Sequence, residues 1–480
     1  MRILLSVVFA VLLQEGTFLS QGVSFSTHYR NASESNAPLT QKQKERIHSI
    51  AQELREIVIG LASEEQKNRL SAELAALFAK SGDMQAAREI AGSIKGDAER
   101  TDALASIARA QGSNQDFSGA METASSIALE SSRAMAIVDV IGAQAEAKDF
   151  TGALQNAGKL GDQPAAYTAA LLKIAEARTK ANQKTEALEL LAKALNSSSS
   201  LTGCSYEEIR GCRSSLLGQI ASAQFHAGDA AAAQKTLEVA EQGLAQSSQE
   251  ERLFSVVELV SAEQEIGHPE RATDLLSNMP GVAGRFGETI SAMQKVSQAA
   301  EKGDLAAVRT TVEAISDPEQ RSFGQLILAQ AYASSGDGKS ALDTLRALKP
   351  VSQRAQFAGQ IAQGLAQAGR FSEADEALKI GVAAAETEEN DAQLEELLTA
   401  EVQVHAEAGD VEATRAKAAL MKNRERRAEA VREAARTLAS KKKDQEVLKW
   451  AAGEESGFIR ANLLLGAAEG IATQDATDKK

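Results

Sequence analysis

Aromatic residues and proline are scarce in this sequence of 480 residues, and basic residues are outnumbered by acidic ones, 52 to 66. Aromatic residues make up 4% of the chain and prolines number only six, so Ala, Leu, Glu, Gln and Lys dominate. That composition is typical of helices. The formal net charge of -14 disfavours a nucleic-acid partner, whose phosphates require clustered Lys and Arg.

Catalytic and metal-binding motifs are also missing. The sequence contains neither H-E-x-x-H nor G-x-S-x-G. Its histidines have no ligand spacing, and no histidine or third cysteine stands near the two cysteines. The sequence therefore predicts a protein that is not an enzyme, with no cofactor, no metal and no small-molecule substrate. The five histidines are His28, His48, His226, His268 and His405.

One stretch resembles a nucleotide-binding loop without completing it. Residues 332 to 345 read YASSGDGKSALDTL, and a phosphate-binding loop requires G-x-x-x-x-G-K-[ST] between a strand and a helix. The first glycine of that motif falls on Ala333, and no strand pattern precedes it. Gly338, Lys339 and Ser340 are instead expected to open a helix.

The amino terminus has the pattern of an export signal. Arg2 precedes an apolar run from Ile3 to Leu13, which is too short to span a bilayer, and Ser20-Gln21-Gly22 offers a small-x-small cleavage site. We therefore expect a signal peptide over 1–22, a disordered lead-in over 23–40 and a secreted or periplasmic protein. An uncleaved anchor and a chance apolar start are the alternatives.

A small residue recurs along the chain at a spacing that returns to 33. It stands five positions after a Gly-Asp or similar pair that follows an apolar helical run, as Ala341 does in GDGKSA. Successive copies are 33, 33, 34, 46, 39, 36, 33, 33, 40 and 33 residues apart, which indicates a repeat array. These reference positions are Ala87, Ala120, Ala153, Ala187, Ala233, Ala272, Val308, Ala341, Ala374, Thr414 and Val447.

The residues before each reference position predict a turn between two antiparallel helices. Glycine five positions before it can end a helix in the left-handed conformation without a Cβ clash. The aspartate that follows can accept from the free amides of the next helix. The glycines are Gly82, Gly228, Gly267, Gly303, Gly336, Gly369 and Gly409, and the aspartates are Asp83, Asp116, Asp149, Asp229, Asp304, Asp337 and Asp410.

These features resemble the tetratricopeptide-type helical repeats, whose two-helix unit has this length. The resemblance rests on Leu328-Ala329 and Tyr332 in a first helix, then Gly336-Asp337 and Ala341, although the family's tryptophan is absent and Gln325 stands there. It implies an all-α solenoid, superhelical, of about eleven helix-turn-helix repeats over 65–455. A helix over 41–64 would precede the repeats, and a C-terminal capping helix and tail over 456–480 would close the open end.

The longest step between reference positions contains an insertion over 197–212. Ser205 and Glu208 resemble a capping box, so a short extra helix is expected there, and Cys204 and Cys212 flank it. In one continuous helix the two cysteines would lie ~12 Å apart, too far for a disulfide. A break at the neighbouring glycines would let them approach. We expect a disulfide in an exported protein, with two buried thiols as the alternative.

Basic residues recur twenty positions before the reference positions, where each first helix begins. A cation in a helix's first turn opposes the helix dipole, so a compensating contact is expected. We expect each guanidinium to reach carbonyls or acids at the end of the preceding second helix, with a ligand-binding ladder as the alternative. The arginines of this ladder are Arg100, Arg133, Arg213, Arg252, Arg321, Arg354 and Arg427, with Lys67 in the first repeat.

Charge is unevenly distributed near the carboxyl end. Residues 373–412 contain thirteen acids and one lysine, whereas 415–449 contain twelve basic residues and five acids. Solvated helix faces explain this pattern, since Glu429 with Arg432 and Glu433 with Arg436 are favourable helical neighbours. The alternative is a basic patch that meets an acidic partner.

The resemblance implies that first-helix residues line a concave groove that binds a protein or peptide. The predicted function is therefore an exported scaffold, and the alternative is a self-associating structural component of a cell envelope or surface layer, a homo-oligomer. The groove residues expected on this basis are Ser222, Ser261, Gln330, Gln363, Gln403, Arg432 and Arg436.

Overall fold

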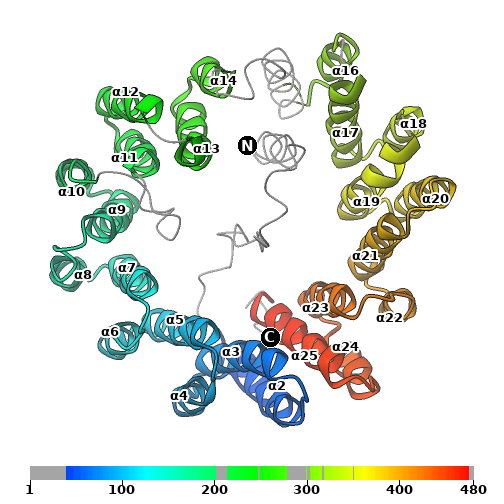
Figure 1. Ribbon diagram of the computed structural model, residues 1–480, viewed down its shortest axis with the longest axis horizontal. Helices are drawn as coiled ribbons and strands as arrows, with labels where there is room; N and C mark the ends of the chain where they lie inside the picture. Colours follow the sequence, from blue (N-terminus) through cyan, green and yellow to red (C-terminus); the bar gives the residue numbers. More distant parts are fainter. Residues whose placement is uncertain are drawn as a thin grey trace. The chain divides into compact units, whose positions relative to one another are not determined.

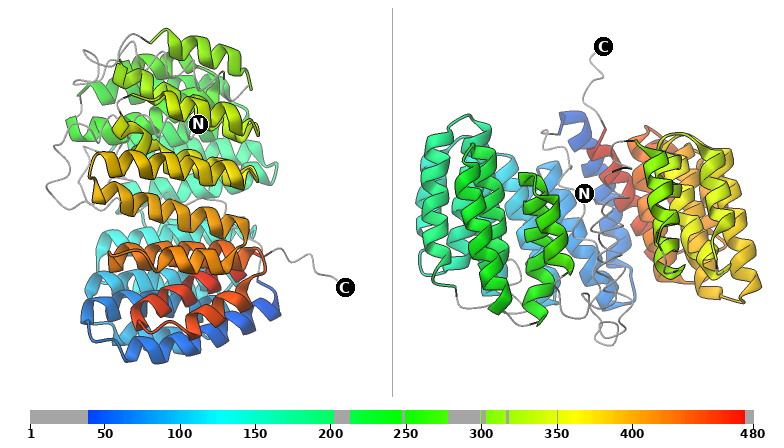
Figure 2. Two further views of the ribbon diagram at one scale, coloured as in Figure 1. Left: turned by 90° about the vertical axis from the view of Figure 1, so that its right-hand side faces the viewer. Right: turned by 90° about the horizontal axis from the view of Figure 1, so that it is seen from above.

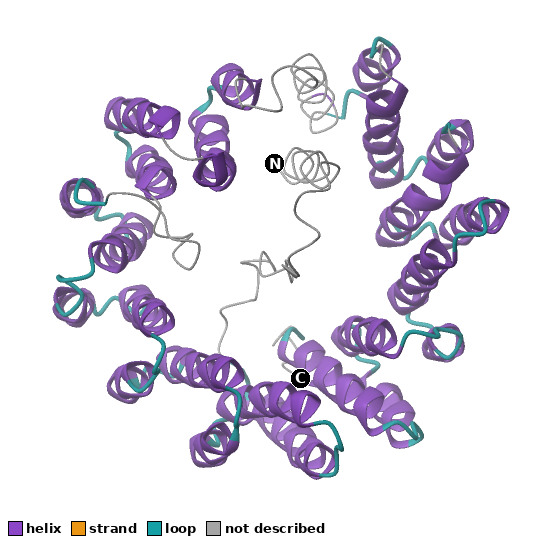
Figure 3. Ribbon diagram, in the orientation of Figure 1, coloured by secondary structure: helices purple, strands orange, loops and turns teal. Residues whose placement is uncertain are grey.

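A computed structural model of the chain describes residues 39–201, 213–246, 249–277, 299, 303–315, 318–349 and 351–474. Over these ranges the chain forms helices joined by short turns, and none of these residues lies in a strand (Figure 3). The helices follow one another as antiparallel hairpins. The predicted all-α helical repeat fold is confirmed.

The chain forms two compact units. Unit 1 contains residues 1–83 and 291–480, and unit 2 contains residues 84–290. The described helices of unit 1 are α2 (Gln41–Ile59), α3 (Glu64–Ser81), α16 (Leu305–Glu313), α17 (Pro318–Ser334), α18 (Gly338–Ala347), α19 (Val351–Gln367), α20 (Phe371–Thr387), α21 (Asp391–Ala408), α22 (Val411–Ala418), α23 (Arg424–Ser440), α24 (Asp444–Ala452) and α25 (Gly457–Ala472). Those of unit 2 are α4 (Met84–Ser93), α5 (Asp97–Ser113), α6 (Phe117–Ser125), α7 (Glu130–Glu146), α8 (Phe150–Gly158), α9 (Pro164–Lys180), α10 (Lys184–Ser198), α11 (Arg213–Ala227), α12 (Ala230–Gln246), α13 (Gln249–Ile266) and α14 (Pro269–Ser277).

Within each unit the helices lie in two layers. Successive first helices contact one another, as α17, α19, α21 and α23 do in unit 1 and α5, α7, α9 and α11 do in unit 2. The second helices cover one side of this layer (Figure 1). The other side of the first-helix layer is the surface where the resemblance predicts a groove.

The reference positions lie in the buried interior of the hairpins. All eleven side chains are fully buried, with 0% of their surface exposed. Eight are alanine, and the largest is valine. A larger side chain at any of them would force two helix backbones apart, because protein interiors have no spare volume there. The recurring small residue in the sequence is therefore a packing requirement of the hairpin.

The turns between helices follow the predicted left-handed geometry. The seven predicted glycines all have φ between 71° and 100°. The other four repeats use Gln115, Lys148, Asn182 and Lys442 at the same place, with φ between 61° and 67°. Six of the predicted aspartates then accept from the backbone amide three residues later at 2.9–3.1 Å. These are Asp116, Asp149, Asp229, Asp304, Asp337 and Asp410.

The irregular repeat steps have a simple structural cause. Most described second helices contain eight to ten residues, whereas α10 contains 15 and α12 and α20 contain 17 each. These are the helices that carry Ala187, Ala233 and Ala374, after which the steps lengthen to 46, 39 and 40 residues. In the steps of 39 and 40 residues the extra residues extend the second helix, whereas the step of 46 residues also contains 202–212, which lies outside the described residues. The described first helices keep an almost constant length.

The two ends of the array meet inside unit 1. Helix α25 corresponds to the capping helix expected over 456–480. Twelve of its 16 residues are buried, because α2 and α3 from the start of the chain pack on it beside α23 and α24 (Figure 2). Helix α2 thereby takes the place of the second helix that α25 would otherwise lack.

The contact between α23 and α25 is unusually close because α25 carries two glycines on one face. A Cβ at Gly466 would lie 2.0 Å from the Arg432 carbonyl oxygen, and a Cβ at Gly470 would lie 2.3 Å from that of Arg436. Glycines four residues apart share a helix face, so both remove their bulk from the same contact. This spacing lets two helix backbones touch directly.

Several predicted features lie outside the described residues. The proposed signal peptide and almost all of the lead-in fall in 1–38, and both cysteines fall in 202–212. The helix expected over 41–64 corresponds to α2, which begins after Thr40. Thr40 caps it through a capping box with Gln43.

Candidate interaction surface

Four arginines of the ladder make the same contact, which joins one hairpin to the next. Each lies in the first turn of a first helix and donates to the carbonyl oxygen six residues earlier, at the end of the preceding second helix. Such carbonyls have no partner within their own helix, so a guanidinium satisfies them well. The pairs are Arg100 and Ile94 (3.4 Å), Arg133 and Ile127 (2.9 Å), Arg321 and Ile315 (2.7 Å), and Arg354 and Leu348 (3.0 Å).

The remaining ladder positions differ. Arg427 donates to the Glu454 carboxylate at 2.8 Å, beyond the second helix of its own hairpin. Lys67 pairs with Glu64 in its own helix at 3.7 Å. For Arg213 the equivalent carbonyl lies within 202–212, and the side chain of Arg252 lies outside the described residues. In the four regular repeats the accepting carbonyl lies one or two residues past the last residue of the preceding second helix.

Six of the expected groove residues occupy one equivalent position, eleven residues before the reference position in the first helix. They are Ser222, Ser261, Gln330, Gln363, Gln403 and Arg436, and all are half-buried. In unit 1 three of these are glutamines on α17, α19 and α21, which contact one another in that order. The Gln330 amide donates to Gln360 Oε1 at 3.4 Å, and the Gln403 amide donates to the Ala430 carbonyl at 3.1 Å. Unit 1 therefore presents a row of uncharged amides.

In the same layer of unit 2, ionisable side chains of neighbouring first helices form pairs. Arg109 on α5 pairs with Asp139 on α7 at 3.2 Å. His226 on α11 lies 2.7 Å from Glu265 on α13. The amide row of unit 1 is thus a local property of that unit and not a general feature of the repeat.

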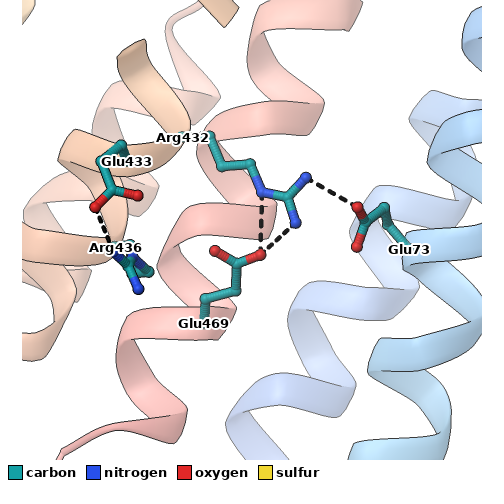
Figure 4. A network of polar contacts seen from close by, with 5 residues as sticks. All are labelled: Glu73, Arg432, Glu433, Arg436 and Glu469. Atoms are coloured by element: carbon teal, nitrogen blue, oxygen red, sulfur yellow. Dashed lines mark hydrogen bonds and ion pairs between the residues drawn. The ribbon is translucent and has the colours of Figure 1, made fainter. Parts of the chain in front are cut away.

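Arg432 has a different role from the expected one. Its guanidinium lies between Glu469 of α25 and Glu73 of α3, with Nε 3.0 Å from Glu469 and Nη1 3.1 Å from Glu73 (Figure 4). Only 20% of its side chain is exposed. Burial opposes the charge, but the two carboxylates outweigh it and raise the pKa of Arg432 further. Arg432 therefore joins the two ends of the array, and Glu73 and Glu469 neutralise its charge.

Part of the basic segment near the carboxyl end pairs with the acidic segment before it. Lys441 pairs with Glu407 at 3.1 Å, and Lys417 pairs with Glu401 at 2.5 Å. The Lys422 backbone amide donates to Glu395 at 2.8 Å. Arg436 pairs with Glu433 of its own helix (Figure 4). The charge asymmetry of the sequence therefore reflects contacts between consecutive repeats, and these contacts disfavour a free basic patch.

A polar pair at the turns, which the sequence analysis missed, holds several hairpins of unit 2. Gln144, nine residues before its reference position, donates to the capping Asp149 at 2.6 Å and accepts from Asn156 of the second helix at 2.9 Å. Gln111 makes the same two contacts, with Asp116 at 2.9 Å and with Thr123 at 2.7 Å. The hydrogen bonds from the Gly152 amide and from Gln144 lower the pKa of Asp149.

The sixth repeat inverts this pair. Glu263 stands where three other repeats of unit 2 have Gln111, Gln144 and Gln224, and His268 stands where those repeats have aspartate. The Glu263 carboxyl lies 3.0 Å from the His268 Nδ1. The Glu263 side chain is fully buried. Arg271 lies 3.4 Å from Glu263 and 2.8 Å from Glu241. Burial, followed by the hydrogen bond with Glu241, raises the pKa of Glu263 above its ordinary value.

Neither a metal centre nor a membrane-spanning helix occurs in the part of the chain that the structure covers. The described His, Cys, Asp and Glu residues form no group of three or more that could hold a metal ion. None of the described helices combines the length and the apolar character that a bilayer requires.

The ladder predicts the effect of removing one arginine. Arg321→Ala should lower the free energy of unfolding by ~1–3 kcal/mol, because the Ile315 carbonyl loses a charge-assisted hydrogen bond in a half-buried site. Arg321→Lys should recover little of this, since an ammonium on a flexible chain does not reproduce the guanidinium geometry. Urea unfolding followed by circular dichroism measures both. An Arg321→Ala variant as stable as the parent would show that the contact contributes nothing.

The inverted pair predicts a pH dependence that Glu263→Gln should remove. Because the folded pKa of Glu263 is raised, the folded state retains a proton that the unfolded state releases as pH rises above about 4.5. The wild-type free energy of unfolding should therefore fall between that pH and the folded pKa, by about 1.4 kcal/mol for each unit of difference. Above the folded pKa this contribution should be constant.

The control for that experiment is a double variant that copies the polar pair of another repeat. Glu263→Gln combined with His268→Asp recreates the pair formed by Gln144 and Asp149, and should fold without the pH-dependent component. Urea midpoints of the wild type and both variants across this pH range provide the comparison. A wild type whose stability relative to Glu263→Gln stays constant, or rises with pH, would contradict the assignment.

No protein-family profile and no curated protein matches the sequence. Solved structures give only weak similarities. Ton1535 from Thermococcus onnurineus NA1 is 16% identical with a TM-score of 0.23, covering 83% of this chain and 98% of that one. The Naa15/Naa10 structure bound to HypK-THB is 15% identical with a TM-score of 0.28, covering 87% and 70%. A circular tandem repeat protein with a novel repeat topology is 16% identical with a TM-score of 0.13, covering 90% and 88%.

Proposed function

We propose that this chain is an exported, non-enzymatic scaffold that binds a protein or peptide along the first-helix layer of unit 1. The observation that carries the proposal is the row of Gln330, Gln363 and Gln403 at equivalent positions on three contacting helices. The resemblance of the sequence to tetratricopeptide-type repeats implies a groove on this same layer, which supports the proposal.

The chemistry of the row favours a partner recognised through its backbone. A glutamine amide both donates and accepts, so it can pair with the carbonyl and the N–H of an extended segment. The row carries no charge of its own, which suits an uncharged segment better than an acidic or basic one. A repeat of one amide on each helix suits an extended chain that crosses several hairpins.

The binding test compares alanine variants on the two helix layers. Gln363→Ala, and more strongly Gln330→Ala with Gln363→Ala, should weaken binding of a partner captured by the wild-type chain, with a melting temperature nearly unchanged. Gln234→Ala on the second helix α12 is the matched control and should bind as the wild type does. Calorimetric titration of the captured partner gives the affinities. Equal affinity for the double variant and the wild type would refute the amide row as the binding surface.

Export is a separate part of the proposal, supported by the apolar run from Ile3 to Leu13 and the small residues Ser20 and Gly22. Intact-mass analysis of the protein from its native source should show loss of about the first 22 residues. Recovery of the protein with Met1 or Arg2 still present would contradict cleavage.

Self-association without a partner is the second candidate function. It is favoured by the regular, alanine-rich repeats, and it would appear as concentration-dependent assembly of the pure chain.

A further inference from the structure

Unit 1 is assembled from two stretches of chain that are joined covalently only through unit 2. The hairpin α2–α3 comes from residues 39–83, and the helices it packs on come from the last third of the chain. This non-covalent contact between α2–α3 and α23–α25 is here called the end junction.

The end junction has an apolar centre. Ile47 and Leu54 of α2 are fully buried, as is Phe458 of α25. The guanidinium of Arg69 on α3 lies 5.4 Å from the centre of the Phe458 ring, and that of Arg424 on α23 lies 5.1 Å from it. A buried ring between two cations from separate segments fixes how the segments meet.

Polar contacts surround this apolar centre and specify the partner segment. The Gln43 amide donates to the carbonyls of Ile471 at 2.9 Å and of Gln474 at 3.1 Å. Each segment also supplies charges that the other neutralises. The ion pairs across the junction are Arg46 with Asp444, Glu53 with Arg460 (2.5 Å), and Glu73 with Arg432 (3.1 Å).

The α2–α3 hairpin is joined covalently to unit 2 through a single short turn. The chain passes into unit 2 directly after Asp83, and the turn contains the left-handed Gly82. A hairpin that contacts its unit non-covalently and has one short covalent connection is the arrangement that allows exchange between protomers.

We propose that the end junction also forms between two copies of this chain, each placing its α2–α3 hairpin on α23–α25 of the other. Every contact of the junction is between segments with no covalent link inside the unit, so a hairpin from a second copy makes the same contacts. The surface is separate from the amide row, and the proposal does not rest on the proposed function. Exchange competes with intramolecular closure, whose effective concentration is high, so the reciprocal dimer is favoured at high protein concentration.

Charge inversion of one ion pair distinguishes exchange from closure in the full-length chain. Glu53→Arg places two arginines at the junction within one copy, and Arg460→Glu places two glutamates there. Mixed together, the two variants restore opposite charges only across copies, giving one wild-type and one inverted pair in the reciprocal dimer. The chain that carries both changes restores the pair within itself and is the matched control.

Native mass spectrometry of the mixture, with one variant labelled with ¹⁵N, reads out the result. We expect mixed dimers several-fold above the 1:2:1 statistical distribution, and a monomeric doubly substituted chain at the same concentration. Separate monomers in the mixture, or dimers in statistical proportion, would overturn the proposal.

A second measurement uses the wild-type chain, so the result does not depend on the variants folding. Wild-type chain refolded from urea at high concentration should contain dimer that persists after dilution, because exchange requires both junctions to open. Refolding at low concentration should give monomer. Monomer at both concentrations would count against exchange.

Discussion

The close crossing of two helices at each reference position is the constraint on which the fold depends. Eleven side chains there are fully buried, and none is larger than valine. The hairpin must therefore reverse direction within a few residues, and the left-handed residue that precedes each crossing makes this reversal. The capping aspartate and the arginine that reaches the previous hairpin then satisfy helix ends that this tight geometry leaves without backbone partners.

Polar groups at the turns vary between repeats while their geometry stays the same. Gln144 with Asp149 and Glu263 with His268 occupy equivalent places, with donor and acceptor exchanged. The exchange preserves a hydrogen bond but places a carboxyl in a fully buried site, where only a shared proton or a neighbouring cation compensates for burial. We therefore expect the sixth repeat to respond to pH, whereas a repeat with the glutamine version has no buried acid at this position.

Charge in unit 1 serves mainly to hold repeats together. The acidic and basic segments that look like separate surfaces in the sequence pair across consecutive hairpins, and Arg432 joins the last hairpins to the first. The uncharged amides of α17, α19 and α21 are therefore the polar groups of the first-helix layer that are best suited to an external backbone. The end junction offers a second kind of surface, one whose complement is already encoded in the same chain.

The sequence by itself determined the repeat, its helices and its turns. The signals for Ala341, Gly336 and Asp337 are local, because a small residue, a left-handed residue and a cap act within a few positions of one another. The start of α2 was likewise predictable from Thr40 and Gln43. The contact of Arg321 with Ile315 could be anticipated for the same reason, since six residues separate the two groups.

Only the tertiary structure decided how the two ends of the array pack on each other and which ion pairs form between distant segments of the chain. Nothing near Arg432 in the sequence indicates Glu73, because the two are brought together by packing α3 on α25 and α23. The same holds for Gly466, whose lack of a side chain matters only because another helix backbone occupies that space. The sequence shows that α25 is mostly apolar but not what covers it, since any apolar helix surface can pack against another. The choice of α2 depends on contacts between residues more than four hundred positions apart in the chain, such as Gln43 with Ile471.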